Sequence, residues 1–491
     1  MLRSALVLKM GSFLRLRMYV VVALGVTLLL LLIFSKQDVF WVDSNATGSF
    51  STSSGQVSTE ASPSMHHRRK AAVYARPTFH EEVVSTMACM LHDEGFHVSI
   101  YVGSGLAIGR LNVPFSEKRK KKAAKFYGHC VDRWITITEP LVKSAYIPNL
   151  DLLIFSTYPI LTHNFVPDYV ALSLIEYAGQ GEAGETETSV VLISHRTNET
   201  LHEQLNVIER HIPRERFTFV FLSEHTELTM AAIFQERGLS YVRVKHDGGT
   251  VPWTGGGDGG EGPYRLSHFF PIMPLQYAEG MGGDSSSFSS SFLSPTPRAL
   301  TDLDHMEAFD SGSGQLFSVQ GNFGGRHAHR KDVKGTVSCL RKLEEEDSRM
   351  VNLDLIGHVV GGKLDTGSLL KGKISMRSDL SSTDYYRAIA NTHFMIVAVA
   401  EADYYCCRAT SSVPAALIAG TPLVAQRSFL KYYPCLNTAP IHSLIAKDTE
   451  CESIATAHKL TKEQYALARQ EIANCSAIFY AEARSLWREL S

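Results

Sequence analysis

The sequence lacks an excess of either charge, and it lacks the cysteine density of a disulfide-stabilised small protein. Lys and Arg number 48 against 50 Asp and Glu, a formal net charge of -2. This balance argues against general nucleic-acid binding, which needs a basic surface. Eight cysteines in 491 residues are too dilute for a disulfide scaffold. Hydrophobic residues at 44% and charged residues at 20% instead indicate a globular chain with room for two or three domains.

One apolar run lies near the start of the chain, at residues 18–34, and it contains no charged residue. As a helix it would span about 25 Å, enough for a thinner bilayer. Residues 1–17 contain basic side chains and no acid, which predicts a cytoplasmic tail. The run is not followed by the small-x-small site of a removed signal peptide. We therefore expect a single-pass type II signal anchor, with the body in the lumen of the Golgi or endoplasmic reticulum.

Two further features fit a luminal body. N-glycosylation sequons begin at Asn45, Asn198 and Asn474. Five of the eight cysteines lie from Cys406 onward, where a local disulfide is expected in an oxidising compartment. The eight cysteines allow about 105 full pairings, so the sequence assigns none. Their spacing matches no zinc site, and neither a metal nor another cofactor is expected.

The remaining chain divides into a stem, two α/β domains and a linker. Residues 35–69 are rich in Ser, Thr and Gly, as a flexible stem would be. The Gly-, Ser- and Pro-rich part of 276–314 predicts a disordered linker between a first domain at 70–275 and a second at 315–491. Apolar runs alternate with helical patterns in both domains. The predicted fold class is therefore α/β, two Rossmann-like parallel-sheet domains facing a cleft, with ligands at the carboxyl ends of the strands.

The expected elements follow from periodicity and from Gly, Pro and capping signals. In the first domain the expected strands are 71–76, 97–102, 151–156, 189–194 and 217–222, and the expected helices are 80–94, 200–211 and 226–237. In the second domain we expect strands at 315–320, 351–356 and 394–399, an extended segment at 421–425, and helices at 330–346, 413–419, 462–473 and 477–490. Thr461 and Gln464 are positioned to form a capping box at the start of a C-terminal helix.

His80 ends the first strand-to-helix loop, Arg76-Pro-Thr-Phe-His80. A helix N-terminus disfavours a second positive charge and so favours the neutral imidazole. A neutral histidine can accept a proton from a hydroxyl group, which makes His80 a candidate general base. A packing role at the helix start fits the spacing of this lone histidine equally well.

A glycine turn and a group of cations follow the strand expected at 315–320. The segment Ser318-Val-Gln-Gly321-Asn322 precedes Arg326, His327, His329, Arg330 and Lys331. Backbone N–H groups at a helix start attract anions, and arginine adds bidentate contacts. The candidate diphosphate ligands are Gly321, Asn322, Arg326 and Arg330. A solvated basic loop is the alternative.

Two stretches resemble the GT-B fold glycosyltransferases that use nucleotide sugars. Pro77-Thr-Phe-His80, followed by Gly95-Phe-His-Val98, is similar to the opening of these enzymes, in many of whose inverting members a histidine follows the first strand. Phe96 stands where that pattern has histidine, and the usual glycine before the catalytic histidine is absent.

The second stretch is similar to the donor-binding half of the same superfamily. A strand ending at Gly357-His358 is followed by a helix, a strand, Glu401, Thr410-Ser-Ser and Gly420-Thr-Pro. The resemblance implies a catalytic role for Glu401, the first of two glutamates in retaining members, although Ala415 occupies the second position. It implies donor contacts from His358, Ser411, Ser412 and Gly420. N-capping is the common alternative for the two serines.

The resemblance implies a metal-independent transferase that moves a hexosyl or pentosyl unit from a nucleotide-sugar donor to a glycan, protein or lipid acceptor. Both stereochemical outcomes stay open, inversion with His80 as base or retention with Glu401. The alternative is a non-catalytic sugar-binding membrane protein that retains the GT-B cleft.

Two other patterns predict no activity. Gly367–Lys373 resembles a phosphate-binding P-loop, but Ile374 replaces the required Ser or Thr and no strand precedes it, so we expect an ordinary loop. Asp302-Leu-Asp304 has the spacing of a manganese-binding motif, but it lies in the expected linker and not at a strand end.

Overall fold

The computed structural model describes residues 68–75, 81–103, 127–137, 142–156, 169–180, 187–194, 205, 208–244, 250–252, 263–272, 314–323, 330–347, 349–358 and 367–490. They belong to a compact unit, His67–Ser491, distinct from Met1–His66. Several predicted features lie outside the described residues: the tail 1–17, the anchor 18–34, nearly all of the stem and linker, His80, Arg326, Asn45 and Asn198. Within the described part, none of the helices has both the length and the hydrophobicity needed to cross a membrane.

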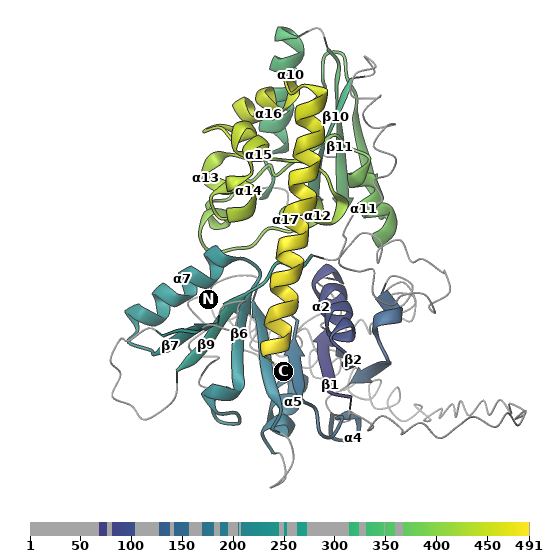
Figure 1. Ribbon diagram of the computed structural model, residues 1–491. Coiled ribbons are helices and arrows are strands. Elements are labelled where there is room, and N and C mark those ends of the chain that lie inside the picture. The colour runs from purple at the N-terminus through teal and green to yellow at the C-terminus, as the bar shows by residue number, and fades with distance from the viewer. Residues whose placement is uncertain are drawn as a thin grey trace, which may run out of the picture. The chain divides into compact units, whose positions relative to one another are not determined.

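The first half of the described chain forms a nine-stranded sheet in the order β3-β2-β1-β4-β5-β6-β9-β7-β8 (Figure 1). Its strands are β1 Lys70–Ala75, β2 His97–Gly103, β3 Arg133–Ile137, β4 Leu152–Phe155, β5 Ser189–Ser194, β6 Phe217–Phe221, β7 Tyr241–Val244, β8 Thr250–Pro252 and β9 Tyr264–His268. Every pairing is parallel except that of β7 with β8. The central strands β4 and β6 are buried at every residue, as expected for a parallel sheet covered on both faces.

The predicted helices 80–94 and 226–237 are confirmed, most of the predicted helix 200–211 lies outside the described residues, and two observed helices were not predicted. The helices of this half are α2 Glu81–Asp93, α4 Val142–Ala145, α5 Tyr169–Gly179 and α7 Glu224–Glu236, with short 3₁₀ turns η1 Gly128–Cys130 and η3 Arg214–Arg216. The predicted end of α2 at Gly95 is confirmed. Gly95 adopts φ +84°, and the N–H of Phe96 donates to the carbonyl of Leu91, a helix-ending turn that favours glycine. A disulfide joins Cys89 of α2 to Cys130 of η1.

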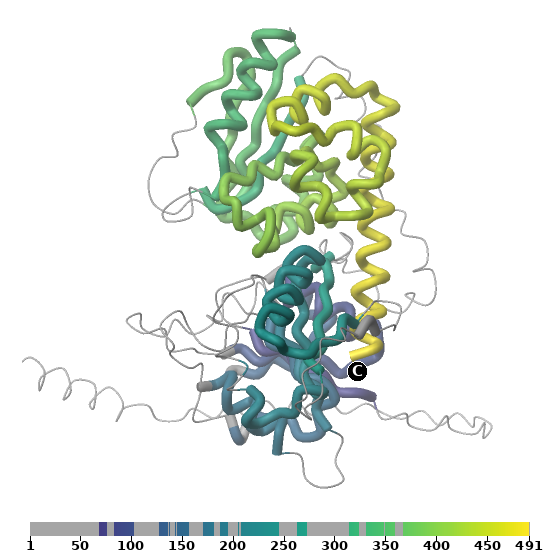
Figure 2. Tube along the Cα trace, turned by 90° about the vertical axis from the view of Figure 1, so that its left-hand side faces the viewer, coloured from purple at the N-terminus to yellow at the C-terminus, as the bar shows by residue number. Residues whose placement is uncertain are grey.

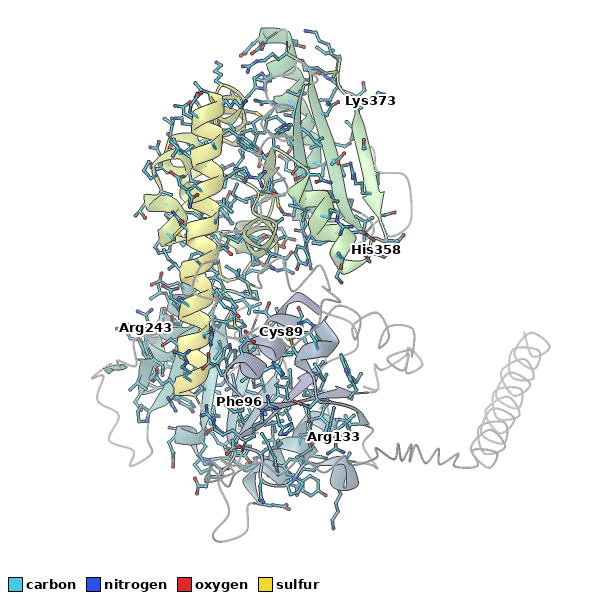
Figure 3. The ribbon with its side chains drawn as sticks, turned by 45° about the vertical axis from the view of Figure 1, so that its right-hand side comes forward. Cys89, Phe96, Arg133, Arg243, His358 and Lys373 are labelled. Atoms are coloured by element: carbon cyan, nitrogen blue, oxygen red, sulfur yellow. A yellow bond between two sulfur atoms is a disulfide. The ribbon has the colours of Figure 1, made fainter. Side chains whose placement is uncertain are left out.

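The second half forms a five-stranded sheet, all parallel, in the order β12-β11-β10-β13-β14. Its strands are β10 Gln315–Asn322, β11 Val351–His358, β12 Ile374–Ser378, β13 Phe394–Ile396 and β14 Leu423–Val424. Figure 3 shows His358, the last residue of β11, and Lys373, which precedes β12, at opposite ends of this sheet. Gly357 is opposite Gly321 in the register, and a Cβ on Gly357 would lie 1.9 Å from the carbonyl oxygen of Gly321. Only glycine fits this close approach of the two strands.

Helices of the second half are α10 Val333–Glu346, α11 Ser382–Ala390, α12 Ser412–Ala419, α13 Arg427–Leu430, α14 Pro434–Thr438, α15 Pro440–Ile445, α16 Glu450–His458 and α17 Lys462–Glu489, with the 3₁₀ turn η6 Ala402–Tyr405. The prediction of two C-terminal helices is wrong, because α17 is continuous through Asn474-Cys-Ser. Cys475 is buried and disulfide-bonded to Cys435, and such tertiary packing outweighs the weak helix propensity of this triplet. The capping box of Thr461 and Gln464 is confirmed.

Helix α17 contacts elements of both halves, α12 and α15 in the second and α2 in the first. Figure 2 shows it in yellow, running from the second sheet's helices toward the first sheet. Near its end, the guanidinium group of Arg484 donates to the carboxylate of Glu94 at 2.6 Å, and Arg488 pairs with the same carboxylate. Two cations on one largely buried carboxylate outweigh the cost of its burial and lower the pKa of Glu94.

Candidate functional site

The strand order of the second sheet defines a topological switch point between β10 and β13. The chain proceeds from β10 outward to β11 and β12, then returns to β13 on the other side of β10. Open α/β sheets bind ligands at the carboxyl ends of the strands beside such a point. The polar side chains at this edge of the sheet therefore form the candidate site.

Lys331 lies at this edge, between the end of β10 and the start of α10. Its partly buried ammonium group donates to the carbonyl of Val397 at 2.6 Å and to the hydroxyl of Ser412 at 2.7 Å. Burial lowers the pKa of Lys331 to about 8, against the raising effect of the Glu450 carboxylate. The Lys331 side chain is therefore mostly protonated at neutral pH. Gly321 makes room for it, because a Cβ there would lie 3.1 Å from the Lys331 side chain.

Two arginines and a glutamate continue the site beyond Lys331. The carboxylate of Glu401 accepts a hydrogen bond from Arg408 at 3.0 Å, and its other oxygen lies 4.0 Å from Nε of Arg330. The guanidinium group of Arg408 also stacks over the ring of Tyr404, 5.1 Å from its centroid. Arg330 and Arg408 thus place two cations against the Glu401 carboxylate, and Lys331 follows Arg330 directly in the chain.

Hydroxyl groups meet the cations at the start of α12. The side chain of Gln320, on β10, accepts a hydrogen bond from Ser412 at 3.1 Å and donates one to Ser411 at 3.3 Å. Ser411 is the N-cap residue of α12, but its side chain makes no capping bond. Ser412 is buried and Ser411 is exposed. The structure thus brings Ser411 and Ser412 together with Lys331 at a helix start that can accept an anion.

The other strand-end candidates lie at the same edge. Asn322 is opposite His358 in the register of β10 and β11, and both are exposed. The imidazole of His358 contacts the carboxylate of Asp379 at 3.1 Å, and both groups are solvent-exposed (Figure 3). His358 ends β11, which lies one strand further from the switch point than β10.

Gly420 is not brought to this group. It is the C-cap of α12, with φ +69°, and so lies at the opposite end of that helix from Ser411 and Ser412. The left-handed conformation of a helix C-cap explains the glycine without a ligand.

Of the predicted glycosylation sites, Asn474 is exposed on α17, where its side-chain carbonyl accepts a hydrogen bond from Gln470 at 2.9 Å.

The proposed catalytic histidine and one arginine remain untested. Strand β1 ends at Ala75 and helix α2 begins at Glu81, while His80 lies outside the described residues, as does Arg326. Gln320, Lys331 and Arg408 were not predicted as site residues. Lys331 belonged to the run of cations, but nothing in the sequence marks Gln320 or Arg408.

The P-loop-like segment is a loop, as predicted. Its backbone N–H groups at Leu370 and Gly372 donate to the buried carboxylate of Glu344 at 2.6 and 2.7 Å, and that of Lys371 does so at 3.2 Å. The protein's own carboxylate therefore occupies the donors that a phosphate would need.

A scan against protein-family models finds no match to the chain, and a search of curated proteins finds none either. Solved structures do match. An alpha,alpha-trehalose-phosphate synthase (UDP-forming) from Burkholderia vietnamiensis aligns over 86% of this chain and 98% of its own, at 9% identity and a TM-score of 0.50. Similarity at this identity shows the fold alone. The two parallel-sheet α/β domains are consistent with the GT-B fold.

Other similar structures score slightly lower. An E. coli structure described as trehalose-6-phosphate bound with UDP-2-fluoro glucose covers 85% of this chain and 98% of its own, at 10% identity and a TM-score of 0.48. An alpha-glucosyltransferase in complex with UDP covers 84% and 96%, at 11% identity and a TM-score of 0.47.

Proposed function

We propose that the chain is a glycosyltransferase that moves a sugar from a nucleotide-sugar donor to a glycan, protein or lipid acceptor. The observation that carries this proposal is the group of Arg330, Lys331 and Arg408 with Ser411 at the switch point of the second sheet. A nucleotide sugar carries a diphosphate whose charge grows as the sugar leaves. Fixed cations and hydroxyls at that point stabilise such charge most in the transition state.

In this proposal, the chain's own cations take the role that a metal has in other transferases. Arg330 and Lys331 contact the diphosphate, and the hydroxyl of Ser411 donates to it from the helix start. Arg408, held by Glu401 and Tyr404, adds positive charge beside them. A hexosyl or pentosyl group then passes to an acceptor hydroxyl bound by the first domain.

Two residues compete for the catalytic role at the sugar. His80, before α2, would deprotonate the acceptor hydroxyl and give inversion at the anomeric carbon. Glu401 would act in a retaining reaction. Its carboxylate is held by Arg408, and Ala415, at the position of the second glutamate in retaining members, is buried within α12. These contacts favour a structural role for Glu401 and hence His80 and inversion.

We further propose that residues 18–34 anchor the chain in the Golgi or endoplasmic reticulum membrane, with the body in the lumen. Asn474 then faces the glycosylation machinery, and the disulfides fit the oxidising lumen.

A non-catalytic sugar-binding membrane protein is the second candidate, favoured by Ala415 at the position of the second glutamate. A panel of nucleotide sugars offered to the purified full-length chain separates the two. A transferase releases the nucleoside diphosphate from at least one donor, by transfer or slow hydrolysis. A folded chain that binds a donor and never releases its diphosphate is a binding protein instead.

A further inference from the structure

Adjacent cysteines lie in the middle of the segment that carries the candidate site. Cys406 and Cys407 are disulfide-bonded to each other, with a sequence separation of 1. Glu401 precedes them, and Arg408, Ser411 and the start of α12 follow them. Bonding between neighbours closes a small ring through a single peptide unit, which restricts the backbone of both residues.

The carbonyl groups around this ring are held by helix α7, which follows strand β6 of the first sheet. The hydroxyl of Thr229 lies 2.8 Å from the carbonyl oxygen of Cys406 and 2.9 Å from that of His225 in its own helix, so its single proton is shared between the two. The imidazole Nε2 of His225 lies 3.2 Å from the carbonyl oxygen of Arg408, so this nitrogen must carry the proton. Burial lowers the pKa of His225 and so supports the neutral ring that this contact uses. We name Cys406, Cys407, Arg408, His225 and Thr229 together the disulfide latch.

One residue of the latch belongs to two contacts at once. The carbonyl of Arg408 accepts from α7, while its guanidinium group donates to Glu401 at 3.0 Å. The position of Arg408 in the site therefore depends on the same short backbone segment that the Cys406–Cys407 ring restricts. A change that gives this backbone segment more freedom should therefore weaken both the contact of the Arg408 carbonyl with His225 and that of its guanidinium group with Glu401.

The sulfur atoms are positioned for exchange with a thiol. Cys406 is exposed and Cys407 half-buried, so neither cysteine of this pair is buried. Each of the other disulfides has at least one buried cysteine, namely Cys89 and Cys130, Cys339, or Cys475, although Cys451 is also exposed. We propose that Cys406–Cys407 is a redox modification site, at which reduction by a dithiol opens the disulfide latch and weakens the site beside it.

The step is a two-electron thiol–disulfide exchange. A thiolate of the dithiol attacks Sγ of Cys406, the Cys406–Cys407 bond breaks, and Cys407 leaves as a thiolate that takes up a proton. The second thiolate of the reagent then attacks the reagent sulfur bound to Cys406. It closes the reagent's own disulfide and releases Cys406, also as a thiol. The dithiol is oxidised and the protein is reduced.

The consequence in the structure is local. Opening the ring gives Cys406 and Cys407 independent backbone freedom, so the carbonyls facing Thr229 and His225 lose their fixed positions. The start of α7 and the segment 401–411 should then open more often. The effect on donor binding rests on the function proposed above, while the loosening of α7 does not.

Hydrogen exchange of the full-length chain tests the inference without any ligand. Graded dithiothreitol, followed by alkylation and peptide mapping, identifies the concentration at which Cys406 and Cys407 are labelled. At that concentration, exchange should become roughly tenfold faster in peptides covering 224–231 and 401–411, and reoxidation should reverse it. Unchanged exchange after complete labelling of both cysteines would overturn the proposal.

Three variants sharpen the test. The double variant Cys406→Ser with Cys407→Ser should exchange fast from the start and should not respond to dithiothreitol, which controls for the other disulfides. Thr229→Val should reproduce part of the effect, and Thr229→Ser, which keeps the hydroxyl, should not. A double variant that still responds to the reagent assigns the effect to another disulfide and rejects the proposal.

A donor titration separates this inference from the proposed function. Reduction should weaken nucleotide-sugar binding by about tenfold, the loss of one charge-assisted contact. If neither state binds a nucleotide sugar but exchange changes as stated, the proposed function fails and the disulfide latch stands. If the oxidised chain binds a donor and reduction alters neither exchange nor affinity, the latch fails and the function stands.

Discussion

Lys331 donates a hydrogen bond to the hydroxyl of Ser412 across 2.7 Å, and so links the entry to helix α10 with the start of helix α12. The two residues are far apart in the sequence and come from opposite sides of the switch point. The contact places a partly buried cation beside the helix start that, in our proposal, holds a diphosphate.

Replacing Lys331 by Met should weaken the site and the fold together. Ser412 and the carbonyl of Val397 would lose a charged donor in a partly buried position, which costs roughly 1–3 kcal/mol of unfolding free energy. Urea unfolding measures this loss. Lys342→Met, on the exposed face of α10, is the matched control and should change the stability little. Equal urea-unfolding midpoints for the Lys331→Met and Lys342→Met variants would contradict the structural role of Lys331.

The same lysine predicts a pH dependence. Burial lowers its pKa to about 8 from an ordinary 10.5, so the folded chain loses this proton before the unfolded chain does. Between these values the unfolded state binds more protons, and the contribution of Lys331 to stability therefore rises with pH. The affinity for an anion should change in the opposite direction, because deprotonation removes the positive charge of Lys331. Affinity for a nucleoside diphosphate should fall as pH rises through about 8, and Lys331→Met should remove that step.

Gly357→Ala should destabilise the second sheet. The added Cβ would lie 1.9 Å from the carbonyl oxygen of Gly321, so the strands β10 and β11 must move apart. Overpacking of this kind costs typically about 1–3 kcal/mol, to be measured by urea unfolding. Ser378→Ala, at the neighbouring register position on β12, is the control. A stability equal to the control would show that the strands are not this close.

The buried parts of the fold were predictable from the sequence because parallel strands read as continuous apolar runs. The edge strand β12 was missed, since four of its five residues are exposed and its pattern is not apolar. Strand β13 is shorter than predicted because the backbone turns at Ala398, which has φ +49°. The place of β9 between β6 and β7 depends on pairing between distant segments, which local periodicity does not report.

The candidate site was predictable only in outline. Gly321, Arg330 and Ser411 could be proposed from the sequence because glycine turns, cations and hydroxyls at helix starts have local signals. The burial of Lys331 and the pairing of Arg408 with Glu401 depend on tertiary packing. Gly420 was predicted to contact the donor because a helix C-cap and a close ligand contact both favour glycine.

His80→Ala tests the choice between two catalytic mechanisms. If His80 is the general base, turnover should fall by roughly 10²–10⁴-fold with donor binding nearly intact, because the proposed donor contacts lie on the second sheet. The product should also have the inverted anomeric configuration, measured by proton NMR. A retained configuration would reject the base role of His80 and assign the reaction to Glu401.

The proposed anchor has its own test. The full-length chain expressed into sealed microsomes should resist carbonate extraction, and its body should be protected from added protease. A soluble product lacking the first forty or so residues would show a cleaved signal instead.

Calorimetric titration of the full-length chain with a panel of nucleotide sugars and nucleoside diphosphates, for the wild type and Arg330→Ala, tests the central claim most directly. We predict that at least one ligand binds the wild type, and that Arg330→Ala weakens it by about 1.5–3 kcal/mol, the loss of a charge-assisted contact. Arg387→Ala, on the exposed side of α11, should bind as the wild type does. A folded chain that binds none of these ligands, or an Arg330→Ala variant with unchanged affinity, would contradict a diphosphate site at the switch point.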